Sequence, residues 1–146
     1  MTTTAARPVP VPEPVRLSLL LWLIAIAAGA AEALVHLLLP VPPTPAQLGA
    51  RFAIYAVLTV LVLSLRTGRN AVRWAVAVLL GGFGTVSLVV EPVSSLLAGG
   101  SPGAFLAAAD VPTLLGAGLR VVHVVAVLAA LVLMFRPAAN AWFRRG

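Results

Sequence analysis

The sequence contains no cysteine and few charged side chains. The absence of cysteine excludes disulfides, thiol chemistry, thiolate metal ligands and palmitoylation. Only 10% of the 146 residues are charged, with four acids against ten bases, and every base is arginine. Since 61% of the residues are hydrophobic and the mean hydropathy is +1.07, a soluble globular domain of this size is excluded. The composition indicates a membrane protein.

Four apolar runs fill most of the chain, and each is long enough to cross ~30 Å of hydrocarbon as a helix. They predict an all-α fold, an integral membrane four-helix bundle. The predicted spans cover about 17–39, 48–65, 71–98 and 112–135. They form one transmembrane domain over 16–136, with no separate soluble domain.

The two ends of the chain differ in composition from the spans. In residues 1–15, Pro8, Pro10, Pro12 and Pro14 alternate with other residues, a pattern that predicts a disordered, extended tail. Residues 137–146 are expected to form a short basic tail. An alternative for the first span is a secretory signal peptide, because Ala28-Gly29-Ala30 follows a basic and apolar stretch. Cleavage there would leave three spans.

The arginines indicate the orientation of the spans. The two loops at the far side, 40–47 and 99–111, contain no arginine. The opposite side carries Arg7, Arg16, Arg66, Arg69, Arg73, Arg136, Arg144 and Arg145. The positive-inside rule predicts that both termini are cytoplasmic. We expect the protein to lie in the inner (plasma) membrane of a bacterial cell. The net charge of +6 then reflects contact with anionic lipid, so no nucleic-acid partner is expected.

Ionisable residues inside the spans lie at similar depths. At a rise of 1.5 Å per residue, Glu32, Arg51, Glu91 and Arg120 lie about 22 to 27 Å above the arginine-rich side. Small residues share their helix faces, which favours a position inside the bundle. We predict the ion pairs Glu32 with Arg120 and Glu91 with Arg51, since unpaired charges are costly in a membrane. The complete predicted polar set is Glu32, His36, Arg51, Tyr55, Ser87, Glu91, Arg120 and His123.

The polar set allows three functional interpretations. The first is a structural network in a small structural or accessory membrane subunit, with a membrane protein or a second copy as partner and lipid around it. The alternative is a binder or proton-coupled transporter of a small anionic or lipidic ligand, held by Arg51 and Arg120. The third is an intramembrane metal-dependent enzyme, with Glu32, His36, Glu91 and His123 as weak candidate ligands. No cofactor is predicted, and no catalytic residue is assigned.

A glycine-rich run interrupts the third span at Gly81-Gly82-Phe83-Gly84. Such runs can bind phosphate, but this one lies within a span and no lysine follows it. We therefore interpret it as a kink or a site of close helix approach. Farther along the same span, Pro92 has no N–H to donate, so the carbonyl of Leu88 should lack its usual helical partner.

Overall fold

The computed structural model describes residues 10–144, and these residues form helices with no strand among them. The all-α prediction is confirmed. Four helical segments are long and apolar enough to cross a membrane: Glu13–Leu38, Pro45–Thr67, Asn70–Leu97 and Val111–Met134. They correspond to the four predicted spans, with shifted boundaries.

The first segment consists of α1, Glu13–Val35, and a short 3-10 turn, His36–Leu38. The helix begins before the predicted Leu17, so the last residues of the predicted tail are helical. Pro14 is compatible with this start because it lies in the first turn, where the backbone N–H has no helical partner. The tail prediction for residues 1–9 lies outside the described residues.

The second segment consists of α2, Pro45–Leu63, and the 3-10 turn Ser64–Thr67. A capping box explains the start of α2: Thr44 Oγ1 accepts a hydrogen bond from the Gln47 N–H, and Gln47 Oε1 accepts one from the Thr44 N–H. At the other end of this segment, Gly68 has a positive φ of 73° and permits a tight turn into the third segment.

The third segment is continuous but irregular. It consists of α3, Asn70–Val76, a π-helical stretch, Ala77–Gly84, and α4, Thr85–Leu97. A Cβ atom on Gly81 would lie 3.0 Å from Leu131 Cδ2, so α6 approaches the π-helical backbone closely. A close helix approach, one of the two interpretations of the glycine run, is therefore present at Gly81. Pro92 lies inside α4, as predicted.

The remaining helices are α5, Pro102–Ala108, α6, Val111–Met134, and α7, Pro137–Phe143. Both short helices lie in segments that we predicted to be a loop and a tail. The segment 137–143, part of the predicted short basic tail, is helical, and its residues Ala139 and Phe143 are one turn apart and fully buried. α7 therefore packs against the end of the bundle.

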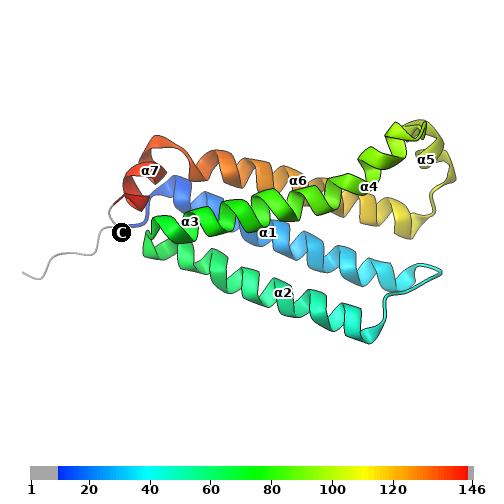
Figure 1. Ribbon diagram of the computed structural model, residues 1–146, viewed down its shortest axis with the longest axis horizontal. Coiled ribbons are helices and arrows are strands. Elements are labelled where there is room, and N and C mark those ends of the chain that lie inside the picture. Colours follow the sequence, from blue (N-terminus) through cyan, green and yellow to red (C-terminus); the bar gives the residue numbers. More distant parts are fainter. Residues whose placement is uncertain (1–9, 145–146) are drawn as a thin grey trace, which may run out of the picture.

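The chain forms an elongated bundle (Figure 1). α1 packs along much of α6 on one side and against α2 on another. The start of α1, the turn after α2 and α7 lie together, at what we call the arginine-rich end. The loop after α1 and the helix α5 lie at the opposite, distal end. An even number of long segments thus brings both described chain ends to the same end of the bundle.

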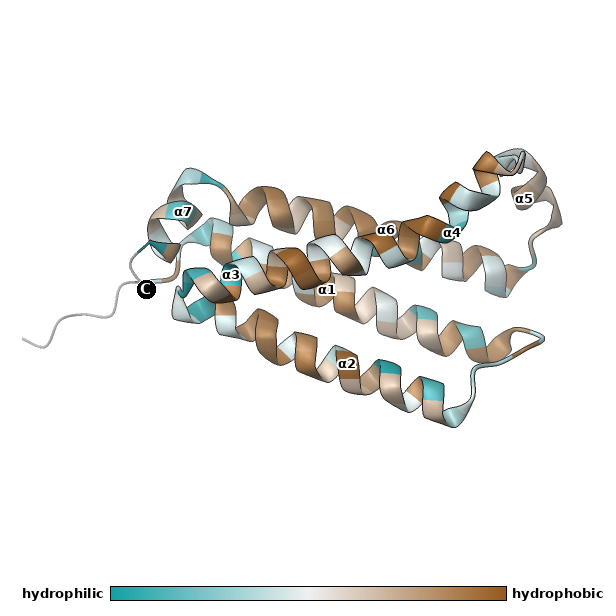
Figure 2. Cartoon of the chain, viewed as in Figure 1, coloured by the Kyte–Doolittle hydropathy of each residue, from teal (hydrophilic) through white to brown (hydrophobic). Residues whose placement is uncertain are grey.

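The apolar core lies toward the arginine-rich end. Trp22, Leu65, Met134 and Phe143 are fully buried there. By contrast, Val62 is the one buried residue of α2, and α4 has none. Most residues of the long helices are hydrophobic, whereas hydrophilic residues appear at the ends and on the distal part of α1 and α2 (Figure 2). The distal half is therefore less tightly packed than the arginine-rich half.

Candidate functional site: a polar cavity in the distal half

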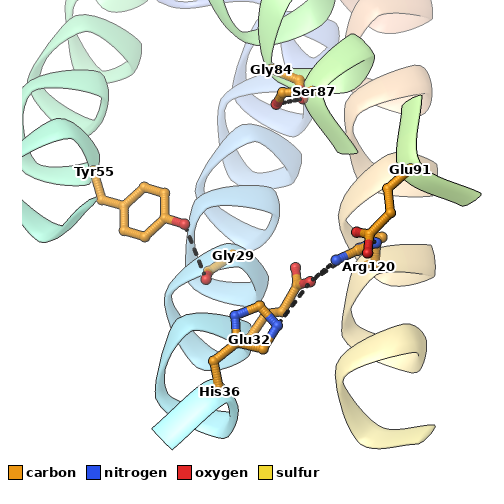
Figure 3. Close-up of polar contacts among 8 residues, drawn as sticks. All are labelled: Gly29, Glu32, His36, Tyr55, Gly84, Ser87, Glu91 and Arg120. Atoms are coloured by element: carbon orange, nitrogen blue, oxygen red, sulfur yellow. Dashed lines mark hydrogen bonds and ion pairs between the residues drawn. The ribbon is translucent and has the colours of Figure 1, made fainter. Parts of the chain in front are cut away.

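An ionic cluster connects three helices in the distal half (Figure 3). From α6, Arg120 donates to Glu32 Oε1 on α1 through Nε at 3.0 Å and through Nη2 at 2.8 Å. Its Nη1 also donates to Glu91 Oε2 on α4 at 3.3 Å. Glu32 is 4% exposed, whereas the Glu91 side chain is 82% exposed. Arg120 thus holds one buried and one exposed carboxylate.

The predicted pair of Glu32 and Arg120 is present, but the predicted pair of Glu91 and Arg51 is not. Glu91 contacts Arg120 instead, and Arg51 forms no ion pair with any residue of 10–144. The reason is helix placement, because α2 packs against α1 whereas α4 contacts α6. Depth along the helices correctly suggested which charges lie at one level, but it could not show which helices are neighbours.

A cavity of about 430 Å³ lies between these helices. Its wall includes apolar side chains such as Ile26, Leu58 and Val127. Every residue of the predicted polar set also lines it: Glu32, His36, Arg51, Tyr55, Ser87, Glu91, Arg120 and His123. The structure therefore brings the whole set together around one space.

Gly29 positions two of the polar side chains. The Tyr55 hydroxyl donates a hydrogen bond to the Gly29 carbonyl at 3.1 Å (Figure 3). A Cβ atom on Gly29 would lie 3.3 Å from that hydroxyl and 3.2 Å from His123 Nδ1. The His123 Nδ1 atom is buried and has no hydrogen-bond partner among the described residues. Gly29 is not in the predicted polar set, although its position on the helix face that carries Glu32 was an available signal.

His36 lies beside the ionic cluster, with Nε2 3.9 Å from Glu32 Oε1. Since that oxygen already accepts both hydrogen bonds that Arg120 donates to Glu32, His36 is a neighbour of the cluster and not its main partner. Within residues 10–144, no three histidine or acidic side chains are placed to hold a metal ion together. The metal interpretation of Glu32, His36, Glu91 and His123 therefore stays a prediction.

Ser87 has a local role in the geometry of α4. Its hydroxyl donates to the Gly84 carbonyl at 2.7 Å, at the junction with the π-helical stretch (Figure 3). This bond satisfies a carbonyl where the helix geometry changes. Leu88, whose carbonyl loses its helical donor at Pro92, also lines the cavity.

The cavity therefore combines an apolar wall with two different cationic groups. Arg120 is paired with two carboxylates, whereas Arg51 on α2 is exposed and forms no ion pair within residues 10–144. Comparison of the chain with models of protein families, with curated proteins and with solved structures found no match. The site must be interpreted from its own chemistry.

Proposed function

We propose that this is an integral protein of the bacterial inner membrane with four transmembrane segments and both termini in the cytoplasm. The four long apolar helices support membrane insertion. The orientation is supported by the arginines near one end of the bundle and by their absence from the loops 40–47 and 99–111. In this orientation, the polar cavity lies in the outer half of the membrane.

The proposed function is binding of a small amphiphilic anion in the distal cavity. Arg51 is the observation that carries the proposal, because it lines the cavity and has no ion pair within residues 10–144. A guanidinium within a membrane span requires an anionic partner or water. A ligand carboxylate or phosphate would supply that partner, and the fork of Arg51 is suited to bidentate binding of either group.

The rest of the cavity supports the amphiphilic character of the ligand. Its volume of about 430 Å³ falls in the usual range for small-molecule sites. Ile54 and Leu58 follow Arg51 on α2 and line the same wall, so an apolar chain can extend from the anionic group toward the bundle core. Tyr55 lies between these residues in the sequence, with its hydroxyl at the Gly29 carbonyl.

The full-length protein, delipidated in mild detergent, tests this proposal. Decanoate and decyl phosphate serve as anionic probes, and decyltrimethylammonium serves as the cationic control; binding is measured by native mass spectrometry. We expect Arg51→Gln to weaken binding of the anionic probes about tenfold or more, as loss of a charged contact would. The matched control Arg69→Gln removes the same charge at the arginine-rich end and should bind as the wild type does. Unchanged binding by Arg51→Gln, or equal binding of the cationic probe, would contradict the proposal.

A second candidate function is that of an accessory subunit, which the exposed helices α2 and α4 favour. Among the described residues of α4 none is buried, and Val57 and Val60 of α2 are 68% and 66% exposed. Lipid or a partner helix can cover such surfaces. A stable complex with another membrane protein after purification in mild detergent would support this role, and a monomer that binds the anionic probes would oppose it.

A further inference from the structure

A second cavity lies at the arginine-rich end and shares no lining residue with the distal cavity. It has a volume of about 400 Å³ and is lined by Val11, Arg16, Leu19, Leu20 and Arg66. Arg16 belongs to the start of α1, and Arg66 belongs to the 3-10 turn that follows α2. Contacts between α1 and this turn bring the two arginines to one site although they are far apart in the sequence.

The electrostatic environment of this second cavity is strongly cationic. Neither Arg16 nor Arg66 forms an ion pair with any described residue. Both are exposed, and so are Arg69, Arg136 and Arg144 of the same end. Glu13 is the one acidic residue that the described chain places at this end, and it too has no ion-pair partner. Two arginines that line one cavity, neither of them paired with a carboxylate, favour a bound anion.

The apolar part of the lining specifies the anion further. Leu19 is buried, whereas Leu20 is 54% exposed. Val11, two residues before the start of α1, is half-buried. A free inorganic anion would leave this aliphatic surface uncovered. An anion that carries a hydrocarbon chain would satisfy the arginines and cover the leucine side chain at the same time.

We infer that this second cavity binds the phosphate group of an anionic phospholipid, with its acyl chain along Leu20. The inference rests on the membrane insertion proposed above but not on ligand binding in the distal cavity. Arg16 and Arg66 lie at the end of the bundle where the headgroups of one leaflet would be, and arginine forks match phosphate oxygens. The site would hold one lipid of this leaflet against the ends of α1 and α2.

The experiment measures binding of phosphatidylglycerol and phosphatidylcholine to the delipidated full-length protein by native mass spectrometry. We expect Arg16→Gln/Arg66→Gln to weaken binding of the first phosphatidylglycerol about tenfold or more, while phosphatidylcholine binds weakly to both proteins. The matched control is Arg69→Gln/Arg136→Gln, which removes two arginines from the same end without altering the cavity lining. This control should retain binding within about twofold of the wild type.

Three results would overturn the inference. The first is equal weakening in the two double variants, which would assign the effect to the diffuse charge of this end. The second is tight binding of phosphatidylglycerol by Arg16→Gln/Arg66→Gln. The third is binding of inorganic phosphate as tight as that of phosphatidylglycerol, which would identify a soluble anion as the ligand. Membrane insertion has its own test: if alkaline carbonate extracted the protein from membranes, the protein would not be inserted, whatever the result of the lipid-binding measurement.

Discussion

Arg120 Nη2 lies 2.8 Å from Glu32 Oε1, although 88 positions separate the two residues in the sequence. This contact joins α6 to α1 in the half of the bundle where apolar packing is sparse. The same guanidinium extends to Glu91 on α4, so one side chain connects three of the four long segments. The remaining arginine of the cavity, Arg51, forms no ion pair with any described residue.

Glu32 and Glu91 should contribute unequally to stability, because one is buried and the other exposed. Glu32→Gln removes the negative charge that strengthens two hydrogen bonds from Arg120, and it should lower the free energy of unfolding by about 1–3 kcal/mol. Glu91→Gln should cost less than ~1 kcal/mol. Unfolding by a denaturing detergent, followed by circular dichroism, measures both. Glu13→Gln serves as the control for loss of an exposed, unpaired acid. If Glu91→Gln lowered the free energy of unfolding more than Glu32→Gln, the proposed difference between the two acids would be refuted.

Gly81 and Gly82 form a matched pair within the π-helical stretch. A Cβ atom at Gly81 would lie 3.0 Å from Leu131 Cδ2, whereas one at Gly82 would have no neighbour within 4 Å. We expect Gly81→Ala to destabilise the protein by about 1–3 kcal/mol through overpacking. Gly82→Ala should be neutral or stabilising by up to about 1 kcal/mol, since alanine restricts the unfolded chain. Equal shifts in the unfolding midpoint would show that α6 does not approach the glycine run as described.

Asp110 should make the stability of the protein depend on pH. Hydrogen bonds from the Thr113 side chain and backbone lower the pKa of the Asp110 carboxyl below its usual value, and Oδ1 accepts the Thr113 N–H at 3.0 Å. A depressed folded-state pKa gives stability that is fully present above the unfolded pKa of about 3.9 and is lost as the pH falls through the folded value.

Asp110→Asn isolates this effect because asparagine also caps helices but does not titrate. Thermal unfolding between pH 6 and pH 3 should show a steeper loss of stability on acidification for the wild type than for the variant. The other acids titrate in both proteins, so the difference between the two curves reports Asp110. Parallel curves would mean that the cap at the start of α6 does not favour the charged carboxylate.

The sequence predicted the long helices and the composition of the cavity for a simple physical reason. Hydrophobic runs and the rise of 1.5 Å per residue place Glu32, Glu91 and Arg120 at one depth without any knowledge of contacts. Helix adjacency requires more, because it depends on packing between side chains that are distant in sequence. For that reason the predicted partner of Glu91, Arg51, was wrong. The structure pairs Glu91 with Arg120 and leaves Arg51 without an ion pair among the described residues.

Short helices were missed for a related reason. α7 covers only Pro137–Phe143, too short for a clear apolar period in the sequence. Its stability comes from the burial of Phe143 in the core of the arginine-rich end. Gly29 illustrates the same limit. Its lack of a side chain leaves room for Tyr55 and His123, which lie on two other helices, α2 and α6.

Access to the distal cavity can be measured directly because the protein contains no native cysteine. Ser87→Cys would place a single thiol on the cavity wall, and Thr67→Cys would mark the arginine-rich end. Ser18→Cys is the buried control, since the Ser18 side chain lies in the core and donates to the Ala130 carbonyl at 2.8 Å.

The most direct test of a ligand cavity open to the outer side is labelling of these three variants in sealed vesicles with a membrane-impermeant thiol reagent. Ser87→Cys should react when the reagent is outside right-side-out vesicles, and decyl phosphate should slow that reaction. Thr67→Cys should react only in inverted vesicles, and Ser18→Cys in neither. Reaction of Ser87→Cys only in inverted vesicles, or no reaction while Thr67→Cys is labelled, would contradict the proposed cavity.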